Sequence, residues 1–246
     1  MIRKVTTSML DRKYLALRSG QSSPASKSLA NLVVNKPWGY EYLLTNNPII
    51  EIWHLSLNYH KSTSTHCHPN KKTVLVVLKG QALFSTLNES IELSPFDAVI
   101  IDPAVFHSTQ CLSKNGLKLL ELETPPMKHD LVRLEDKYGR VNKGYEGSEN
   151  MFPANKHHIR FSNNELDKIK TLHTNKISLI SIESADQLKK LPNKQGLAVL
   201  VSGSIKRASN DGSSLYTVGD VVNIRELKKG NYGFVNASVL TLVRKT

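Results

Sequence analysis

The sequence has little cysteine and no long apolar run. Cys67 and Cys111 are its only cysteines, too few for the disulfide framework of a small secreted domain. No stretch approaches the roughly 18 apolar residues that a membrane-spanning helix needs, and residues 1–20 lack the apolar segment of a secretory signal. Hydrophobic residues make up 39% and charged residues 22%, as in globular chains. We therefore expect a cytoplasmic protein, neither membrane-bound nor disulfide-rich.

Positive charge predominates, but it is distributed unevenly. The formal net charge is +12. Residues 1–30 carry six basic and one acidic side chain, residues 31–150 carry twelve and thirteen, and residues 151–246 carry fifteen and seven. The excess consists of scattered lysines, without the arginine-rich helix or the aromatic signature of nucleic-acid binding. The charge indicates a lysine-rich surface first and an anionic small-molecule substrate second, with no nucleic acid and no membrane as partner.

Short apolar runs separated by turn residues predict an all-β fold. From Leu32 onward, runs rich in Val, Ile, Leu and Thr follow one another at close spacing with few helices between them. This spacing is typical of a sandwich or barrel, and the scarcity of helices argues against a parallel sheet. Short helices are expected at about 8–17 and 128–140. The expected strands are 50–58, 73–79, 81–87, 97–102, 106–112 and 117–123.

Two segments of the first half recur in the second half. The letters VLKGQALF around Gly80 match LVSGSIKR around Gly203, and SPFDAVII around Asp97 matches TVGDVVNI around Asp220. Both pairs are 123 positions apart (203 − 80 and 220 − 97), and a shared offset indicates duplication. The predicted domains are a basic N-terminal arm at 1–30, a metal-binding barrel at 31–140, a connection at 141–176 and a degenerate barrel at 177–246.

The spacing of the histidines predicts a metal site in the first barrel. His66 and His68 lie two residues apart at the start of a β-run, so both point to one face and Cys67 points to the other. Two imidazoles placed in this way can share one metal ion, and His107, at the start of a later strand, can complete the set. Four other histidines are interpreted as packed or solvated: His54, His60, His157 and His158.

Four segments resemble those of a known family. THCHPNKKTVLVVLKG, ending at Gly80, and IDPAVFH, ending at His107, resemble the first and second motifs of the cupin superfamily. KPWGYEYLL at 36–44 and DLVRLEDKYGR at 130–140 resemble segments of the phosphomannose isomerase-like cupin domain of mannose-6-phosphate isomerase/mannose-1-phosphate guanylyltransferases. The resemblance covers about 31–140. It implies a bicupin, two double-stranded β-helix (jelly-roll) barrels, of which the second is degenerate.

The resemblance also implies a set of metal ligands, with one departure. The family binds its metal through a Gln or His, a His, a Glu and the histidine of the second motif. His66, His68 and His107 fill three of these places, but Thr73 stands where the family has its glutamate. Either three histidines and water hold a divalent metal, or another carboxylate substitutes. The pattern does not distinguish Zn, Fe, Mn and Ni.

Four further residues are candidates for the active site. Glu121 and Glu123 share a strand face with Leu119, so they are either an inward pair available to metal and substrate or part of a solvated outer face. The resemblance implies that Arg140 is an active-site arginine, the alternative being a surface ion pair. Lys72 follows the histidine motif and is expected on the rim of the pocket, either meeting an anion or exposed to solvent.

The offset also predicts that the second copy lacks the metal site. It places Lys189, Leu191, Gly196 and Gly230 at the positions of His66, His68, Thr73 and His107. None of these four side chains is a metal ligand of the expected kind. We therefore expect the second copy to serve as scaffold, lid or interface.

The resemblance implies an activity on sugars. The leading hypothesis is a metal-binding cupin that isomerises or epimerises a phosphorylated or nucleotide-linked sugar in surface-glycan synthesis, as a cytoplasmic homodimer. One alternative is a non-catalytic carbohydrate-binding or regulatory cupin. Another is a three-histidine iron dioxygenase, because open coordination positions suit oxygen.

Overall fold

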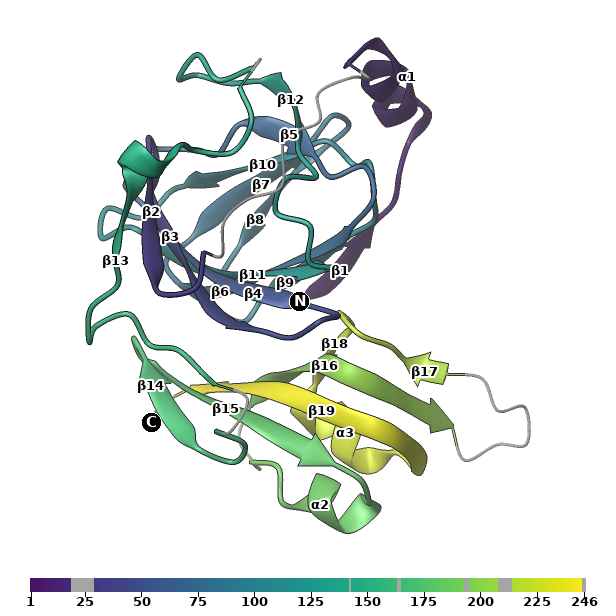
Figure 1. Cartoon of the computed structure of the whole chain (residues 1–246). Helices are drawn as coiled ribbons and strands as arrows, with labels where there is room; N and C mark the ends of the chain where they lie inside the picture. The colour runs from purple at the N-terminus through teal and green to yellow at the C-terminus, as the bar shows by residue number, and fades with distance from the viewer. Residues whose placement is uncertain (19–28, 142, 163–164, 193–194, 208–213, 245–246) are drawn as a thin grey trace.

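A computed structural model describes residues 1–18, 29–141, 143–162, 165–192, 195–207 and 214–244. Figure 1 shows two β-rich bodies stacked against each other, with the N-terminal half forming one body and the C-terminal half the other. Strands dominate both bodies, so the predicted all-β class is confirmed. In the part of the chain that is described, no helix is long and apolar enough to cross a membrane.

The first body is a jelly roll made of two sheets. The larger sheet has the strand order β1-β9-β6-β11-β4-β3-β2-β13, and the smaller has the order β12-β5-β10-β7-β8. In chain order, the strands of the larger sheet are β1 (Ile2–Val5), β2 (Leu32–Lys36), β3 (Gly39–Asn46), β4 (Glu51–Leu57), β6 (Lys72–Lys79), β9 (Ala98–Ile101), β11 (Leu117–Thr124) and β13 (Met151–Pro153). Those of the smaller sheet are β5 (Thr65–Cys67), β7 (Ala82–Thr86), β8 (Ser90–Leu93), β10 (His107–Cys111) and β12 (Val132–Glu135).

The larger sheet is buried on both faces, which explains the continuous apolar letters of its central strands. On β6, Leu75 and Val77 belong to the core of the first barrel. The alternate residues Val74, Val76 and Leu78 belong to a second core that is shared with the C-terminal body. A strand covered on both sides reads as an unbroken hydrophobic run. The TVLVVL segment therefore separates the barrel interior from the interface between the two bodies.

The N-terminal segment forms part of the first body. β1 pairs in parallel with β9, and this strand was not expected from the sequence. The predicted helix at 8–17 is confirmed as α1 (Met9–Arg18). Asp11 of α1 is buried and accepts the backbone N–H of Phe106 at 2.9 Å, which ties the helix to the turn before β10. Residues 19–28 of the predicted arm lie outside the described residues.

The predicted helix at 128–140 is wrong. This segment contains β12, which pairs antiparallel with β5 at the edge of the smaller sheet. Val132 lies opposite Cys67 and Arg133 opposite His66. The free edge of β5 decides the conformation, because it offers backbone partners that local propensity does not reveal.

The second body repeats the pairing scheme of the first. Its sheet has the order β14-β15-β19-β16-β17, with β18 also on β16. The bounds are β14 (Ile169–Leu172), β15 (Asn175–Ile182), β16 (Gly196–Arg207), β17 (Ser214–Tyr216), β18 (Val221–Asn223) and β19 (Tyr232–Arg244), with α2 at Ala185–Lys189 and α3 at Ile224–Lys229. Ala82 pairs with Leu93, and Ile205, 123 positions after Ala82, pairs with Tyr216, 123 positions after Leu93.

Individual hydrogen bonds recur at the same offset. The N–H of Val77 donates to the carbonyl of Asp97 at 3.0 Å, and that of Leu200 donates to the carbonyl of Asp220 at 3.0 Å. The carboxylate of each aspartate also accepts the backbone N–H three residues before it, at 2.8 Å in both cases. The structure thus supports duplication. The predicted domain boundaries, at 30/31, 140/141 and 176/177, stay predictions.

The two bodies share a hydrophobic interface between their sheets. Ile52 and Leu122 of the first body and Val199 and Leu240 of the second all belong to one cluster of buried side chains. The interior of the second body is a separate cluster, which includes Leu188 and Leu191 near α2. The larger sheet of the first body therefore has one face toward the interior of its own barrel and the other face toward the second body.

Candidate metal centre

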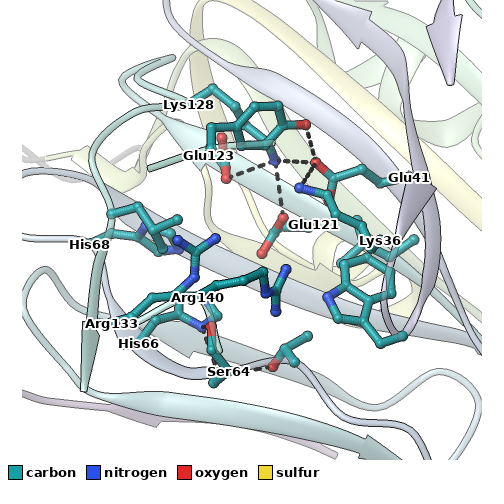
Figure 2. Close-up of a pocket in the computed structure, with 15 residues that line it drawn as sticks. Lys36, Glu41, Ser64, His66, His68, Glu121, Glu123, Lys128, Arg133 and Arg140 are labelled. Carbon is teal, nitrogen blue, oxygen red and sulfur yellow. Dashed lines mark hydrogen bonds and ion pairs between the residues drawn. The ribbon is translucent and has the colours of Figure 1, made fainter. Parts of the chain in front are cut away.

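The three predicted ligands meet inside the first barrel. His66 lies on β5, His68 directly follows that strand, and His107 begins β10, where it is the ladder partner of His66. All three are buried, and each offers a ring nitrogen within 4.8 Å of those of the other two. Figure 2 shows His66 and His68 at one side of the cavity. The antiparallel pairing of β5 and β10 is what brings histidines 39 to 41 positions apart together.

Backbone carbonyls orient all three imidazoles in the same sense. Nδ1 of His66 lies 2.8 Å from the carbonyl of Ser64, that of His68 2.6 Å from Asp130 O, and that of His107 2.9 Å from Val105 O. A carbonyl only accepts, so each Nδ1 carries the proton and each Nε2 keeps a lone pair. This arrangement of the outer hydrogen bonds is usual for metal-binding histidines. The residues therefore fit a divalent metal.

Burial keeps these histidines neutral. It lowers the pKa of His66 and of His68 well below the ordinary 6.5, and that of His107 to about 4. Neighbouring positive charge, notably that of Lys71, lowers the pKa of all three further. Neutral imidazole is the form that binds metal. The site is thus in its ligating form at neutral pH.

Cys67 faces away from the three histidines, as predicted. It packs with Phe106 and Val132 on the opposite side of β5, and burial raises the pKa of its thiol to about 12. His54 is likewise outside the centre. Its Nε2 lies 2.8 Å from Nε2 of His173, at the boundary of the two bodies.

The cavity beside the histidines is lined with charge. It encloses about 450 Å³, part of it open to solvent, and its walls include Glu121, Glu123 and the aromatic rings of Trp38 and Tyr145. Both glutamates point inward, on the same face of β11 as the core residue Leu119. The structure thereby decides the alternative that the pattern left open. Figure 2 shows the two carboxylates facing the Lys128 ammonium.

Lys128 is the centre of a buried ion network that sequence reasoning missed. Its ammonium lies 3.4 Å from Glu41, 3.5 Å from Glu121 and 3.4 Å from Glu123. Burial opposes ionisation of Glu41, but Lys128 and Lys36 hold its pKa at about 2. Burial raises the pKa of Glu121 to about 7, helped by the neighbouring carboxylates and opposed by Lys128. Glu121 can therefore take up or release a proton near neutral pH.

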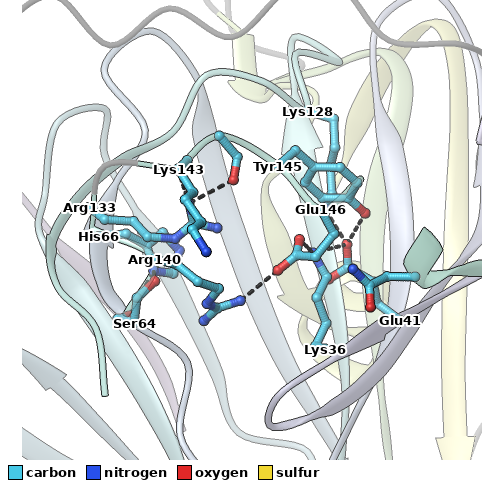
Figure 3. A network of polar contacts seen from close by, with 12 residues as sticks. Lys36, Glu41, Ser64, His66, Lys128, Arg133, Arg140, Lys143, Tyr145 and Glu146 are labelled. Atoms are coloured by element: carbon cyan, nitrogen blue, oxygen red, sulfur yellow. Dashed lines mark hydrogen bonds and ion pairs between the residues drawn. The ribbon is translucent and has the colours of Figure 1, made fainter. Parts of the chain in front are cut away.

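Arg140 lines the cavity, and it also forms buried ion pairs. Its guanidinium contacts Asp136 at 2.7 Å and Glu146 at 2.5 Å, and Glu146 is bound in turn by Lys36. Figure 3 shows Arg140, Glu146 and Lys36 of this chain of contacts. Arg140 therefore both lines the cavity and pairs with Asp136, and its role in an active site stays a prediction.

Arg133 is a cavity residue that the sequence analysis did not identify. It is 3% exposed, and its Nη1 donates to the carbonyls of Lys143 and Gly144 (Figure 3). Its Nε is buried without a partner, and it forms no ion pair with any carboxylate in the described ranges. Burial and the charge of Arg140 lower its pKa. Only the pairing of β12 with β5 places it here, opposite His66.

The expected place of Lys72 is wrong. Its ammonium pairs with Asp220 of the second body at 2.6 Å, away from the cavity. Lys71, one position earlier, is the lysine that points inward, where it pairs with Glu123 at 2.7 Å. Adjacent residues of an extended segment face opposite sides, so Lys71 points into the cavity and Lys72 points away from it.

The second copy has no candidate metal ligand at the positions that correspond to the three histidines and Thr73 of the first copy. Lys189, at the position of His66, ends α2, and Leu191, at that of His68, is buried in the core of the second body. Gly196 and Gly230 occupy the positions of Thr73 and His107. None of these four residues supplies a ligand, so they form no equivalent centre.

Parts of the chain are similar to solved structures of low sequence identity. One neighbour is KdgF from Halomonas sp., at 17% identity over 37% of this chain and 83% of that chain, with a TM-score of 0.35. Another is an RmlC-like cupin from Shewanella frigidimarina, at 17% identity over 44% of this chain and 87% of that chain, with a TM-score of 0.34. A third is the DMSP lyase DddQ from Ruegeria pomeroyi, half of whose length is covered (18% identity, 38% of this chain, TM-score 0.35). No family model and no curated protein matches the sequence. The strand order of the first body is that of an all-β jelly roll.

Proposed function

We propose that the chain is a metal-dependent cupin that isomerises or epimerises an anionic sugar, phosphorylated or nucleotide-linked, in surface-glycan synthesis. The KPWG and LEDKYGR segments support the sugar branch of the cupins, and a specific likeness to phosphomannose isomerases is part of this proposal. The observation that carries it is the juxtaposition of the three-histidine centre with Arg133. A buried guanidinium without a carboxylate partner is costly, and an anionic ligand would relieve that cost.

Each side chain of the cavity then has a role. A divalent metal held by His66, His68 and His107 supplies a Lewis acid for a sugar oxygen when it is bound. Arg133 binds the anionic group of the sugar, since a guanidinium pairs well with carboxylate or phosphate. Glu121 moves the proton between adjacent carbons, because its pKa of about 7 suits general acid–base work.

Arg140 is assigned to positioning. Its bonds to Asp136 and Glu146 hold the loop that carries Tyr145 over the cavity. Lys72, paired with Asp220, has no role in this scheme. A homodimer as the working form also stays a prediction.

The test compares Arg133→Gln with Lys72→Gln by calorimetric titration of sugar phosphates and of the matching neutral sugars. Loss of a charge-assisted hydrogen bond costs about 1.5–3 kcal/mol, so Arg133→Gln should weaken binding of the phosphates by about tenfold or more. Neutral sugars should bind to both variants as to the parent protein. Equal weakening of both ligand classes, or none, would contradict the role of Arg133.

Elemental analysis and turnover assays separate the alternatives. A purified protein that contains a divalent metal and interconverts sugar isomers supports the proposal. A metal-free protein that binds sugar unchanged would favour a binding protein. Oxygen consumption that depends on iron would favour a dioxygenase.

A further inference from the structure

Thr73 is a buried residue of the larger sheet in the first body. It stands at the place of the family's metal-binding glutamate and, like Leu75 and Val77 of the same strand, faces the barrel interior. Its side chain is 1% exposed, and its hydroxyl oxygen has no hydrogen-bond partner among the described residues. A threonine at this position supplies no carboxylate.

Glu123 lies directly opposite Thr73. The two are ladder partners between β11 and β6, and Glu123 also points inward. Its Oε1 is held by Lys71 at 2.7 Å, and Lys128 is 3.4 Å from the same oxygen. Its Oε2 is buried and has no partner in the described part of the chain. The glutamate therefore has one oxygen fixed and one oxygen unsatisfied.

His68 has the matching unsatisfied nitrogen. Its Nε2 is buried without a partner in the described ranges, while its Nδ1 is occupied by the carbonyl of Asp130. His68, Glu121 and Glu123 offer ligand atoms that lie within 4.8 Å of one another. His68 is thus shared between the three-histidine group and the carboxylates of β11. A lone pair and a carboxylate oxygen that are both desolvated and unpaired are expected to meet a cation.

We propose that Glu123 is the carboxylate ligand of the metal, supplied from β11 in place of the glutamate that is absent at position 73 of β6. Lys71 fixes Oε1 and leaves Oε2 for the ion. We assign Glu123 rather than Glu121 because, among the described residues, Glu123 has a buried carboxylate oxygen without a partner and lies opposite Thr73. This inference rests on the metal centre of the proposed function and adds a fourth protein ligand to it.

The experiment measures Zn²⁺ affinity by titration calorimetry and the visible spectrum of the Co²⁺ form. Glu123→Gln should weaken Zn²⁺ binding by about tenfold or more, since even outer partners of metal ligands contribute about 10–100-fold. The Co²⁺ spectrum should change, because one ligand is lost. Glu121→Gln is the matched control and should leave the Co²⁺ spectrum unchanged.

A second variant returns the carboxylate to the family position. Thr73→Glu combined with Glu123→Gln should recover most of the affinity that Glu123→Gln loses. If Glu123 only neutralises Lys71, Glu123→Gln lowers the unfolding temperature but leaves Zn²⁺ affinity unchanged, which would overturn the inference. Glu123→Gln leaves Lys71 without its partner and could fold poorly for that reason. In that case Zn²⁺ affinity is measured on the double variant Lys71→Met/Glu123→Gln, which removes the lysine as well.

His66→Ala distinguishes this inference from the centre itself. If His66→Ala abolishes Zn²⁺ binding and Glu123→Gln does not weaken it, the three-histidine centre holds and the fourth ligand is wrong. If His66→Ala leaves binding unchanged, the metal centre of the proposed function fails.

Discussion

Single residues decide the chemistry of the cavity, through the hydrogen bonds that surround them. The three histidines are ligands because each Nδ1 is committed to a backbone carbonyl. Their burial also changes the expected response to pH. The sequence alone predicts that metal binding weakens as pH falls through roughly 6.5, the ordinary pKa of histidine. The buried rings of the folded protein have lower pKa values, so protons compete with the metal only at lower pH.

We predict that Zn²⁺ affinity stays within about threefold between pH 7 and pH 6 and falls steeply only as pH approaches the pKa of His107, about 4. Stability of the metal-free protein should behave differently. Unfolded histidines bind protons below about 6.5, whereas the folded ones do not, so stability should decrease as pH falls from 6.5 toward 4. Calorimetric titrations and urea unfolding across this range check both effects. A tenfold loss of Zn²⁺ affinity between pH 7 and pH 6 would contradict the neutral-imidazole assignment.

At the scale of elements, the two copies share a glycine turn and differ mainly in the strands around it. Gly80 and Gly203, 123 positions apart, both have positive φ, 86° and 67°. A Cβ on Gly203 would lie 2.1 Å from the carbonyl oxygen of Val235. The first copy separates β6 from β7 at this turn, while in the second copy β16 runs through the equivalent positions as one strand. Both copies keep a glycine because the left-handed backbone conformation recurs at this position, although the lengths of the flanking strands differ.

We predict that Gly203→Ala destabilises the protein. Left-handed backbone costs a non-glycine residue about 1–2 kcal/mol, and the contact with the carbonyl of Val235 adds to this. Gly233→Ala on β19 is the control, since nothing lies within 4 Å of its added Cβ. Alanine in a strand should be neutral or slightly stabilising there. Urea unfolding of the two variants measures the difference, and equal stabilities would contradict the strained turn.

At the scale of the whole molecule, the second body supports the first. Its sheet covers the outer face of the larger sheet of the first barrel, and side chains of both bodies form one core. That same sheet of the first barrel carries Glu121 and Glu123 on its inner face. We therefore expect the two bodies to unfold together.

We predict that Leu240→Ala in the second body destabilises the first body as well. Leu240 is fully buried in the shared core, and such a truncation costs about 2–5 kcal/mol. Trp38 and Trp53, the only two tryptophans, both lie in the first body, so their fluorescence reports on that body alone. Fluorescence and circular dichroism should give the same lowered urea midpoint, with Val235→Ala, at an exposed position, near the parent value. A fluorescence midpoint that does not move would show that the bodies unfold independently.

The sequence by itself determined the local features. Alternation placed His66 and His68 on one face and Cys67 on the other, and a common offset predicted the duplication, because both arise from the geometry of consecutive residues. The absence of ligands at Lys189 and Leu191 followed from the same offset. These features require no knowledge of which strands pair.

Only the tertiary structure determined which side chains line the cavity beside the histidines. Whether Glu123 faces inward depends on which side of β11 covers the barrel, and the place of Arg133 depends on the pairing of β12 with β5, whose residues are more than sixty positions away. Local propensity predicted a helix in the segment of β12, and a strand prevailed because an open sheet edge was available. Register between distant strands is set by the packing of the whole core, so short-range sequence pattern carries little information about it.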